Sequence, residues 1–205
     1  MTQADRDVVY AQFVREEDAG LKRAAKATLR TFLDTFLTDE DRRIWTQAHL
    51  PHLALNRHSR IRHELYQEAI FPVLIEGHEA GDPVSTYWLA KTFQNLCSAK
   101  HLYARIDYSP QDELLKAAYA KAPDNRQIRE ALLESLLAIF AFLDHEWPVG
   151  ILLPQPPGQE DWAGLASDIA LARTLDDGGK HRERLDQFEQ RMAEDRARSE
   201  HRQPE

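Results

Sequence analysis

The stretch SPQDELLKAAYAKAPDNRQ, residues 109–127, ends one helix and begins another within a few residues. Ser109 is a good N-cap because its hydroxyl can accept from a free N–H at the helix start. Pro123 stops this helix, since proline has no N–H to continue the hydrogen-bond ladder. Asp124 is then expected to cap the next helix, with Gln127 at its third position as in a capping box. The stretch predicts a chain of helices joined by short turns.

The helix that follows, predicted over 125–145, is the most apolar in the chain. Apolar side chains cover most of its circumference, and a helix that is apolar nearly all round is a buried one. We therefore expect this helix to be the centre of the core. Its apolar residues are Ile128, Leu132, Leu133, Leu136, Leu137, Ile139, Phe140, Phe142 and Leu143.

The rest of the chain also favours helix. Glycine is scarce, at 8 residues in 205, and β-branched runs are almost absent. Gly81-Asp82-Pro83 predicts the end of one helix and the start of the next. Gly81 suits the position just after a helix end, Asp82 suits an N-cap, and Pro83 suits the first helical position. Pro72 is expected to kink or divide the helix that contains it. The other predicted helices span 4–17, 21–37, 38–50, 58–80, 83–98, 110–122, 160–175 and 181–199.

Two sequence patterns in the middle of the chain are typical of two helices packed as a hairpin. The first is a leucine, a small residue and an aromatic residue at fixed spacing, and the second is an alanine followed five residues later by a proline. Leu89, Ala90 and Phe93 carry the first pattern, and Ala118 and Pro123, within AAYAKAPDN, carry the second. Over 83–145 the chain thus resembles the tetratricopeptide (TPR) family of helical-hairpin repeats. It departs from that family at Thr86, where the family prefers tryptophan, and by the additional residues HLYARIDYS between the two halves.

Together these features predict an all-α fold of antiparallel helical hairpins, either TPR-like or an irregular α-bundle. The last helix has only a thin apolar stripe amid dense charge, so we expect it to lie on the surface. Gly178-Gly179 breaks the chain just before it. The predicted domains are 1–177, a helical domain, and 178–205, a charged C-terminal helix with a frayed tail.

Composition narrows the classes of function. The net charge of −8 and the pI of about 5.6 disfavour nucleic acid as a partner and fit a protein partner with a basic surface. Mean hydropathy is −0.58, and no apolar run approaches the roughly 20 residues that span a bilayer, so no membrane partner is expected. The first residues contain no secretory apolar segment. Cys97 is the only cysteine, which excludes an intramolecular disulfide and favours a cytoplasmic location.

Histidines and arginines gather between residues 49 and 63. A metal site needs three or four ligands that converge, and the spacing of these histidines does not suit one helix face. We therefore expect solvated or capping histidines, with no metal and no cofactor. The arginines leave a phosphate or acidic ligand as an alternative. The residues concerned are His49, His52, His58 and His63, and Arg57, Arg60 and Arg62.

A second cluster, DHEWP, begins at Asp144 and ends the apolar helix. His145 near a helix C-terminus is favoured when protonated, and Glu146 beside Trp147 would suit a general acid if its pKa were raised. The alternative interpretation is a helix end at which the tryptophan seals the core. Cys97 is a further candidate for chemistry, although a lone cysteine is more often a small core residue. The sequence contains no Walker loop, G-x-S-x-G or G-x-G-x-x-G.

The sequence therefore predicts a non-enzymatic cytoplasmic protein that binds another protein, with a small acidic immunity or adaptor protein as one concrete form. The binding surface is predicted on a concave side lined by the helices near 58–63 and 83–94. An all-α enzyme with a site near Asp144, His145 and Glu146 is the alternative, and no catalytic residue is assigned. The predicted binding residues are Arg60, His63, Tyr87, Gln94, His145 and Glu146.

Overall fold

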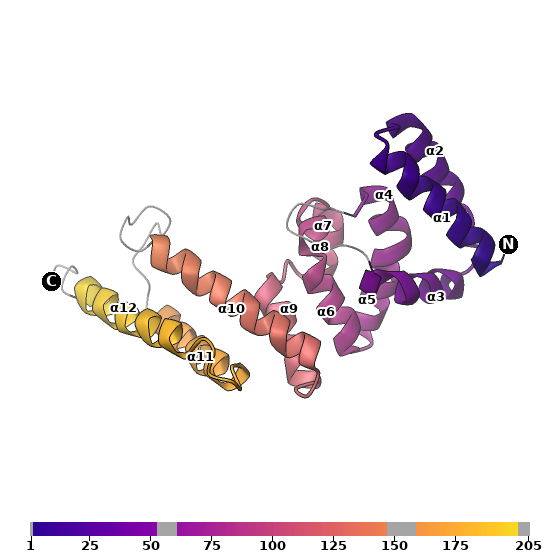
Figure 1. The fold of residues 1–205 in the computed structure, drawn as a ribbon. Helices are drawn as coiled ribbons and strands as arrows, with labels where there is room; N and C mark the ends of the chain where they lie inside the picture. Colours follow the sequence, from indigo (N-terminus) through magenta and orange to yellow (C-terminus); the bar gives the residue numbers. More distant parts are fainter. Residues whose placement is uncertain (1, 53–60, 147–158, 201–205) are drawn as a thin grey trace. The chain divides into compact units, whose positions relative to one another are not determined.

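The computed structural model describes residues 2–52, 61–146 and 159–200, which are all-α, with no strand among them (Figure 1). The predicted fold class is therefore confirmed. The chain divides into two compact units, Met1–Ala118 and Tyr119–Glu205, and α9 (Gln111–Lys121) crosses the division. The division predicted from the sequence at 177/178 is a different one and stays a prediction. Of the helices described, none has the length and apolar character needed to cross a bilayer.

The first unit begins with α1 (Gln3–Asp18), α2 (Lys22–Leu33) and α3 (Asp39–His49). α1 and α2 lie side by side, joined by a turn at Gly20, whose φ of 70° is one that glycine adopts without strain (Figure 1). α1 and α3 each begin with a capping box, in which a threonine and an aspartate exchange hydrogen bonds. The short 3-10 helix η1 (Leu50–His52) follows α3.

Trp45 is the centre of the core formed by these three helices. It is fully buried, and its ring meets those of Tyr10 and Phe32 edge-on, each at 5.0 Å between centroids. Phe36 lies at 5.9 Å, and His49 stacks on the indole at 4.5 Å. Edge-on and offset contacts of this kind add to the free energy gained by burial alone.

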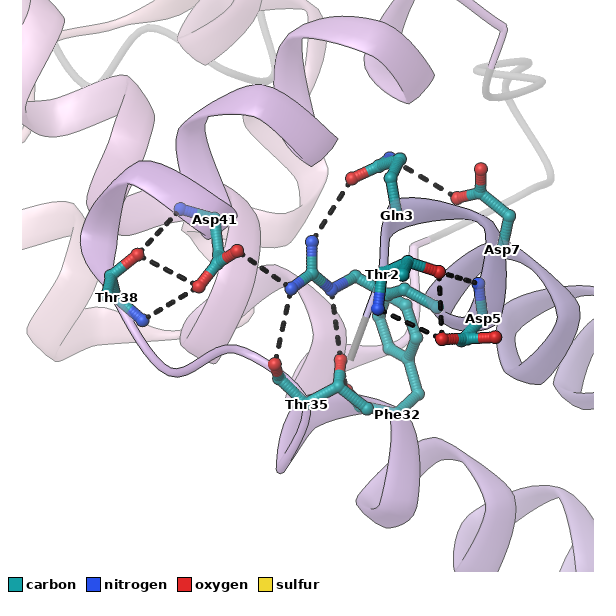
Figure 2. Close-up of polar contacts among 9 residues, drawn as sticks. Thr2, Gln3, Asp5, Asp7, Phe32, Thr35, Thr38 and Asp41 are labelled. Carbon is teal, nitrogen blue, oxygen red and sulfur yellow. Dashed lines mark hydrogen bonds and ion pairs between the residues drawn. The ribbon is translucent and has the colours of Figure 1, made fainter.

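Arg6 is a buried charge that ties α1 to the start of α3, and Figure 2 labels three residues that accept from it, Gln3, Thr35 and Asp41. Its guanidinium donates to the hydroxyl of Thr35 at 3.1 Å and to the carbonyl oxygen of the same residue at 3.3 Å. It also donates to Asp41 at 2.9 Å and to Gln3 at 3.1 Å, and it lies 4.8 Å from the centre of the Phe36 ring. A buried arginine with this many acceptors stabilises the arrangement that provides them.

Pro72 divides the next helical segment, as predicted. α4 (His63–Leu65) runs into a π-helical turn, η2 (Tyr66–Ile70), which is followed by α5 (Phe71–Glu79). Proline near the start of α5 has no N–H for the preceding turn, and the wider π turn accommodates that loss. The Thr46 hydroxyl of α3 donates to the Ala69 carbonyl in this turn at 3.3 Å.

The signal at Gly81-Asp82-Pro83 also acts as predicted. Gly81 has φ of 85°, and the Asp82 carboxylate accepts from the N–H groups of Val84 and Ser85, which begins α6 (Pro83–Lys91). Gly77 makes the close approach of α5 and α6 possible, because a Cβ there would lie 2.1 Å from the Ser85 hydroxyl.

The helix predicted over 83–98 is wrong in one respect, because Thr92 breaks it. Thr92 has φ −98° and ψ 18°, and its hydroxyl donates to the Trp88 carbonyl at 2.7 Å. The buried Tyr66 hydroxyl, at the start of η2, lies 3.0 Å from the Thr92 hydroxyl oxygen, so a second element also holds the break. The chain continues as α7 (Phe93–Cys97), α8 (Lys100–Tyr103) and the 3-10 helix η3 (Ala104–Ile106).

The second unit contains α10 (Arg126–Glu146), α11 (Gln159–Leu175) and α12 (Arg182–Glu200), which contact one another. The N-cap of α10 was predicted one residue too early. The Asn125 side chain, and not Asp124, accepts from the N–H groups of Gln127 and Ile128, at 3.0 and 3.3 Å. Both residue types are good caps, and the turn geometry after Pro123 decides between them.

The prediction that α10 is buried nearly all round is also wrong. One face at helical spacing is buried, and it consists of Ile128, Ala131, Leu132, Leu136, Leu137 and Phe140. Phe140 stacks on Phe188 of α12 at 4.6 Å, but Phe142 is 53 % exposed. The thin apolar stripe predicted for the last helix is present, since Leu185 and Phe188 are buried while the residues around them are exposed.

Candidate functional site

Three aromatic residues form the candidate site, which we call the aromatic surface. Phe93 begins α7, Tyr103 ends α8 and Tyr108 follows η3. The rings of Phe93 and Tyr103 meet edge-on at 5.5 Å between centroids, and those of Tyr103 and Tyr108 at 5.1 Å. Phe93 and Tyr103 are half-buried, whereas Tyr108 is 56 % exposed. The three rings therefore form one continuous row that opens to solvent at Tyr108.

The backbone at Asp107 and Tyr108 is in an unusual conformation. The two residues have φ of 52° and 55°, the left-handed region, which costs a residue with a Cβ about 1–2 kcal/mol. Three hydrogen bonds hold the turn, one of them from the Tyr108 N–H to the Tyr103 carbonyl oxygen at 3.2 Å. Aspartate adopts this conformation readily, but a large aromatic residue does so rarely. The turn therefore presents the Tyr108 ring at an energetic cost.

Cys97 lies close to the aromatic surface but is not an activated thiol. Its thiol is exposed, and burial of part of its surroundings raises its pKa above the ordinary cysteine value. The pKa of Tyr103 is raised as well, first by burial and then by the negative charge that a Cys97 thiolate would carry. A reactive cysteine has a lowered pKa, so the direction of this shift gives no sign of an activated thiol.

The predicted binding residues of the first unit differ in how exposed they are. Gln94 is exposed and follows Phe93 on α7, and His63 is exposed at the start of α4. The Asn95 side chain donates to the Ile61 carbonyl at 2.8 Å, which brings the segment before α4 against α7.

Tyr87 is only 9 % exposed and packs edge-on against Trp88, so little of its ring is open to a partner. Arg60 lies outside the described residues, as do Arg57, His58 and Trp147.

The predicted residues of the second unit lie at the end of α10. The Asp144 carboxylate is bound by Arg191 of α12 at 2.7 Å, and His145 is exposed. Glu146 is the last residue of α10, and its side chain is not among those described. An aspartate that forms an ion pair with a neighbouring helix serves the packing of α10 against α12, and nothing in its surroundings assigns it a part in proton transfer.

The histidines and arginines near residue 50 that the structure describes do not share one set of partners. His49 lies in the aromatic core, with Nδ1 2.9 Å from the Trp45 carbonyl oxygen and Nε2 3.4 Å from Asp7. His52 is exposed at the end of η1, and Arg62 lies 3.5 Å from Glu17. Among the residues that the structure describes, no three histidine, cysteine, aspartate or glutamate side chains are placed to hold a metal ion.

The second unit contains a shallow cavity of about 250 Å³ between the end of α11 and the start of α12. Arg173 and Arg182 line it, beside the carboxylate of Asp176. Arg173 is already paired with Asp186 at 2.6 Å and with Glu189 at 2.7 Å. Carboxylates thus offset the arginine charge, and the cavity has no clear preference for a charged ligand.

Sequence reasoning missed the aromatic surface because residues 99–108 look irregular and carry no periodic pattern. One signal was present. The span 83–106 contains no aspartate or glutamate, although the chain has 34 of them. The left-handed turn itself could not have been predicted, since tyrosine is a poor indicator of positive φ.

Comparison with protein-family models gave no match, and searches of the curated proteins and of the solved structures gave none either. The TPR-like resemblance over 83–145 is neither supported nor opposed by these comparisons, and it stays a prediction.

Proposed function

We propose that the chain acts by binding another protein, and that the aromatic surface of Phe93, Tyr103 and Tyr108 is where the partner docks. The observation that carries this proposal is Tyr108, whose ring is 56 % exposed on a backbone with φ of 55°. Glycine or asparagine would close the same turn with less strain. A tyrosine that keeps this strained backbone supports a use for its exposed ring.

Tyrosine suits such a use. It has a large contact area, a polar tip and few rotatable bonds, and it is enriched among the residues that dominate binding energies. The edge-on contact with Tyr103 holds the Tyr108 ring before a partner arrives, which lowers the entropic cost of binding. Gln94, exposed beside Phe93, adds a polar group at the margin of the surface.

A small acidic immunity or adaptor protein remains the concrete form that we propose for this activity, acting in the cytoplasm. The exposed thiol of Cys97 fits a reducing compartment. The enzymatic alternative near Asp144, His145 and Glu146 gains no support from the geometry, because the aspartate is engaged by Arg191.

The proposal is tested with Tyr108→Asn, which removes the ring and keeps a residue that tolerates left-handed backbone. Phe142→Asn is the matched control, since Phe142 is an aromatic residue of similar exposure in the second unit. Proteins captured by the wild type are identified, purified and titrated against all three forms. We expect Tyr108→Asn to bind at least about tenfold more weakly, the loss typical of a dominant interface residue. Equal binding of the wild type and Tyr108→Asn would contradict the proposal.

A further inference from the structure

We propose that the partner segment received by the aromatic surface is acidic. This inference rests on the proposed function and adds to it the chemistry of the ligand. The span 83–106, which contributes two of the three rings, has no aspartate or glutamate in a chain whose net charge is −8. The same span carries Lys91, Lys100 and Arg105. The segment that carries Phe93 and Tyr103 is therefore positively charged in a protein that is negative overall, and the next acidic residue along the chain is Asp107, beside Tyr108.

Two of these cations are not neutralised by the fold. Arg105 donates to Glu79 of α5 at 2.7 Å, and that pair balances itself. Lys91 is the last residue of α6, two residues before Phe93. Lys100 is the first residue of α8, and Tyr103 follows it by three residues, the spacing that places two residues on one side of a helix. Within the described residues neither lysine forms an ion pair. Their charges remain available to a partner.

The chemistry of the partner follows from this arrangement. Carboxylates placed beside the two lysines would complement their charge, while an apolar or aromatic side chain packs on the Tyr103 and Tyr108 rings. Exposed ion pairs each contribute little to affinity, so the rings supply affinity and the lysines supply preference and salt sensitivity.

A nucleic acid offers negative charge and flat rings as well, but the observations favour an acidic polypeptide. Binding to a phosphate backbone depends on many cationic contacts that release counterions. The span 83–106 offers only two unpaired lysines, too few for the many phosphate contacts on which nucleic-acid binding depends. Single-stranded RNA is therefore the competing ligand in the test.

The test selects peptides from a phage-displayed library of random 12-residue sequences on the full chain. Selected peptides are synthesised and titrated against the wild type, Tyr108→Asn, the double variant Lys91→Gln/Lys100→Gln, and the control Lys26→Gln/Lys180→Gln, which changes two exposed lysines elsewhere. A labelled single-stranded 15-residue RNA is titrated in parallel. We expect enrichment of Asp and Glu over the input library, with binding weakened at least threefold by Lys91→Gln/Lys100→Gln and unchanged in the control.

Neutral or basic peptides whose binding depends on Tyr108 would overturn the inference and leave the proposed function standing. Binding that ignores Tyr108 would oppose both. Tighter, lysine-dependent binding of the RNA, or a selection that enriches no peptide, would also overturn the inference.

Discussion

Replacing Trp45 with alanine is expected to lower the free energy of unfolding by about 4 kcal/mol, the largest loss we expect from any single change in the first unit. The indole is fully buried, and its removal leaves a cavity between the rings of Tyr10, Phe32 and His49. Those rings come from three different helices, so the cavity cannot be filled by a shift of one of them. Urea unfolding followed by circular dichroism measures the loss.

Ile44→Ala is the matched control, because Ile44 precedes Trp45 on α3 and is 49 % exposed. Its replacement should change the free energy of unfolding by no more than about 0.5 kcal/mol. Similar losses in the two variants would mean that α1, α2 and α3 do not share the aromatic core described above.

Arg6→Ala is expected to cost about 3 kcal/mol, the second largest effect. The substitution removes the donor to the Thr35 hydroxyl and carbonyl and the cation paired with Asp41, whose carboxylate still accepts from Thr38. A buried acceptor that loses its donor still carries the free-energy cost of its removal from water. The loss of stability is therefore larger than the net free energy that the hydrogen bonds contribute. Arg15→Ala, an exposed change on the same helix, is the control and should lie within about 0.5 kcal/mol of the wild type.

The pH dependence of stability gives an independent check on Arg6. The Arg6 guanidinium, and after it the Thr38 hydroxyl, hold the pKa of Asp41 below its usual value. Because the folded pKa is lower than the unfolded one, this contribution is fully present above the ordinary carboxyl pKa of about 3.9 and is lost as the pH falls through the folded pKa. The wild type should therefore lose stability more steeply on acidification than Arg6→Ala does. Parallel curves for the two proteins would contradict the role assigned to Arg6.

Local signals predicted helix ends well where one residue decides the backbone. Gly81, Asp82 and Pro83 act as their chemistry requires. The break at Thr92 was not predictable in this way. Tyr66 reaches that threonine from a separate element, so the hydrogen bond that holds the break is tertiary.

Hydrophobic pattern alone overestimated the burial of α10. The pattern counts apolar residues but not the number of helices available to cover them. In the structure a single face is buried, and Phe142 remains exposed. The prediction failed because an apolar circumference indicates burial only when neighbours surround the helix.

The candidate site was predicted only in its neighbourhood. Gln94 and His63 are exposed on α7 and α4, and the segment before α4 contacts α7, whereas Tyr87 is buried against Trp88. The three rings of the aromatic surface come from residues 93 to 108. The left-handed turn at Asp107 and Tyr108 places the last of them next to Tyr103. A conformation that is rare for its residue type cannot be inferred from residue preferences.

The most direct test of the central claim is fluorine NMR of the chain labelled with 3-fluorotyrosine, titrated with the purified partner. The chain has 6 tyrosines, and the Tyr108 signal is assigned by its absence from Tyr108→Asn. We predict that the Tyr108 and Tyr103 signals shift or broaden on binding, while that of the buried Tyr66 stays in place. A partner that binds while the Tyr108 signal remains unchanged would contradict the claim that this ring is the docking point.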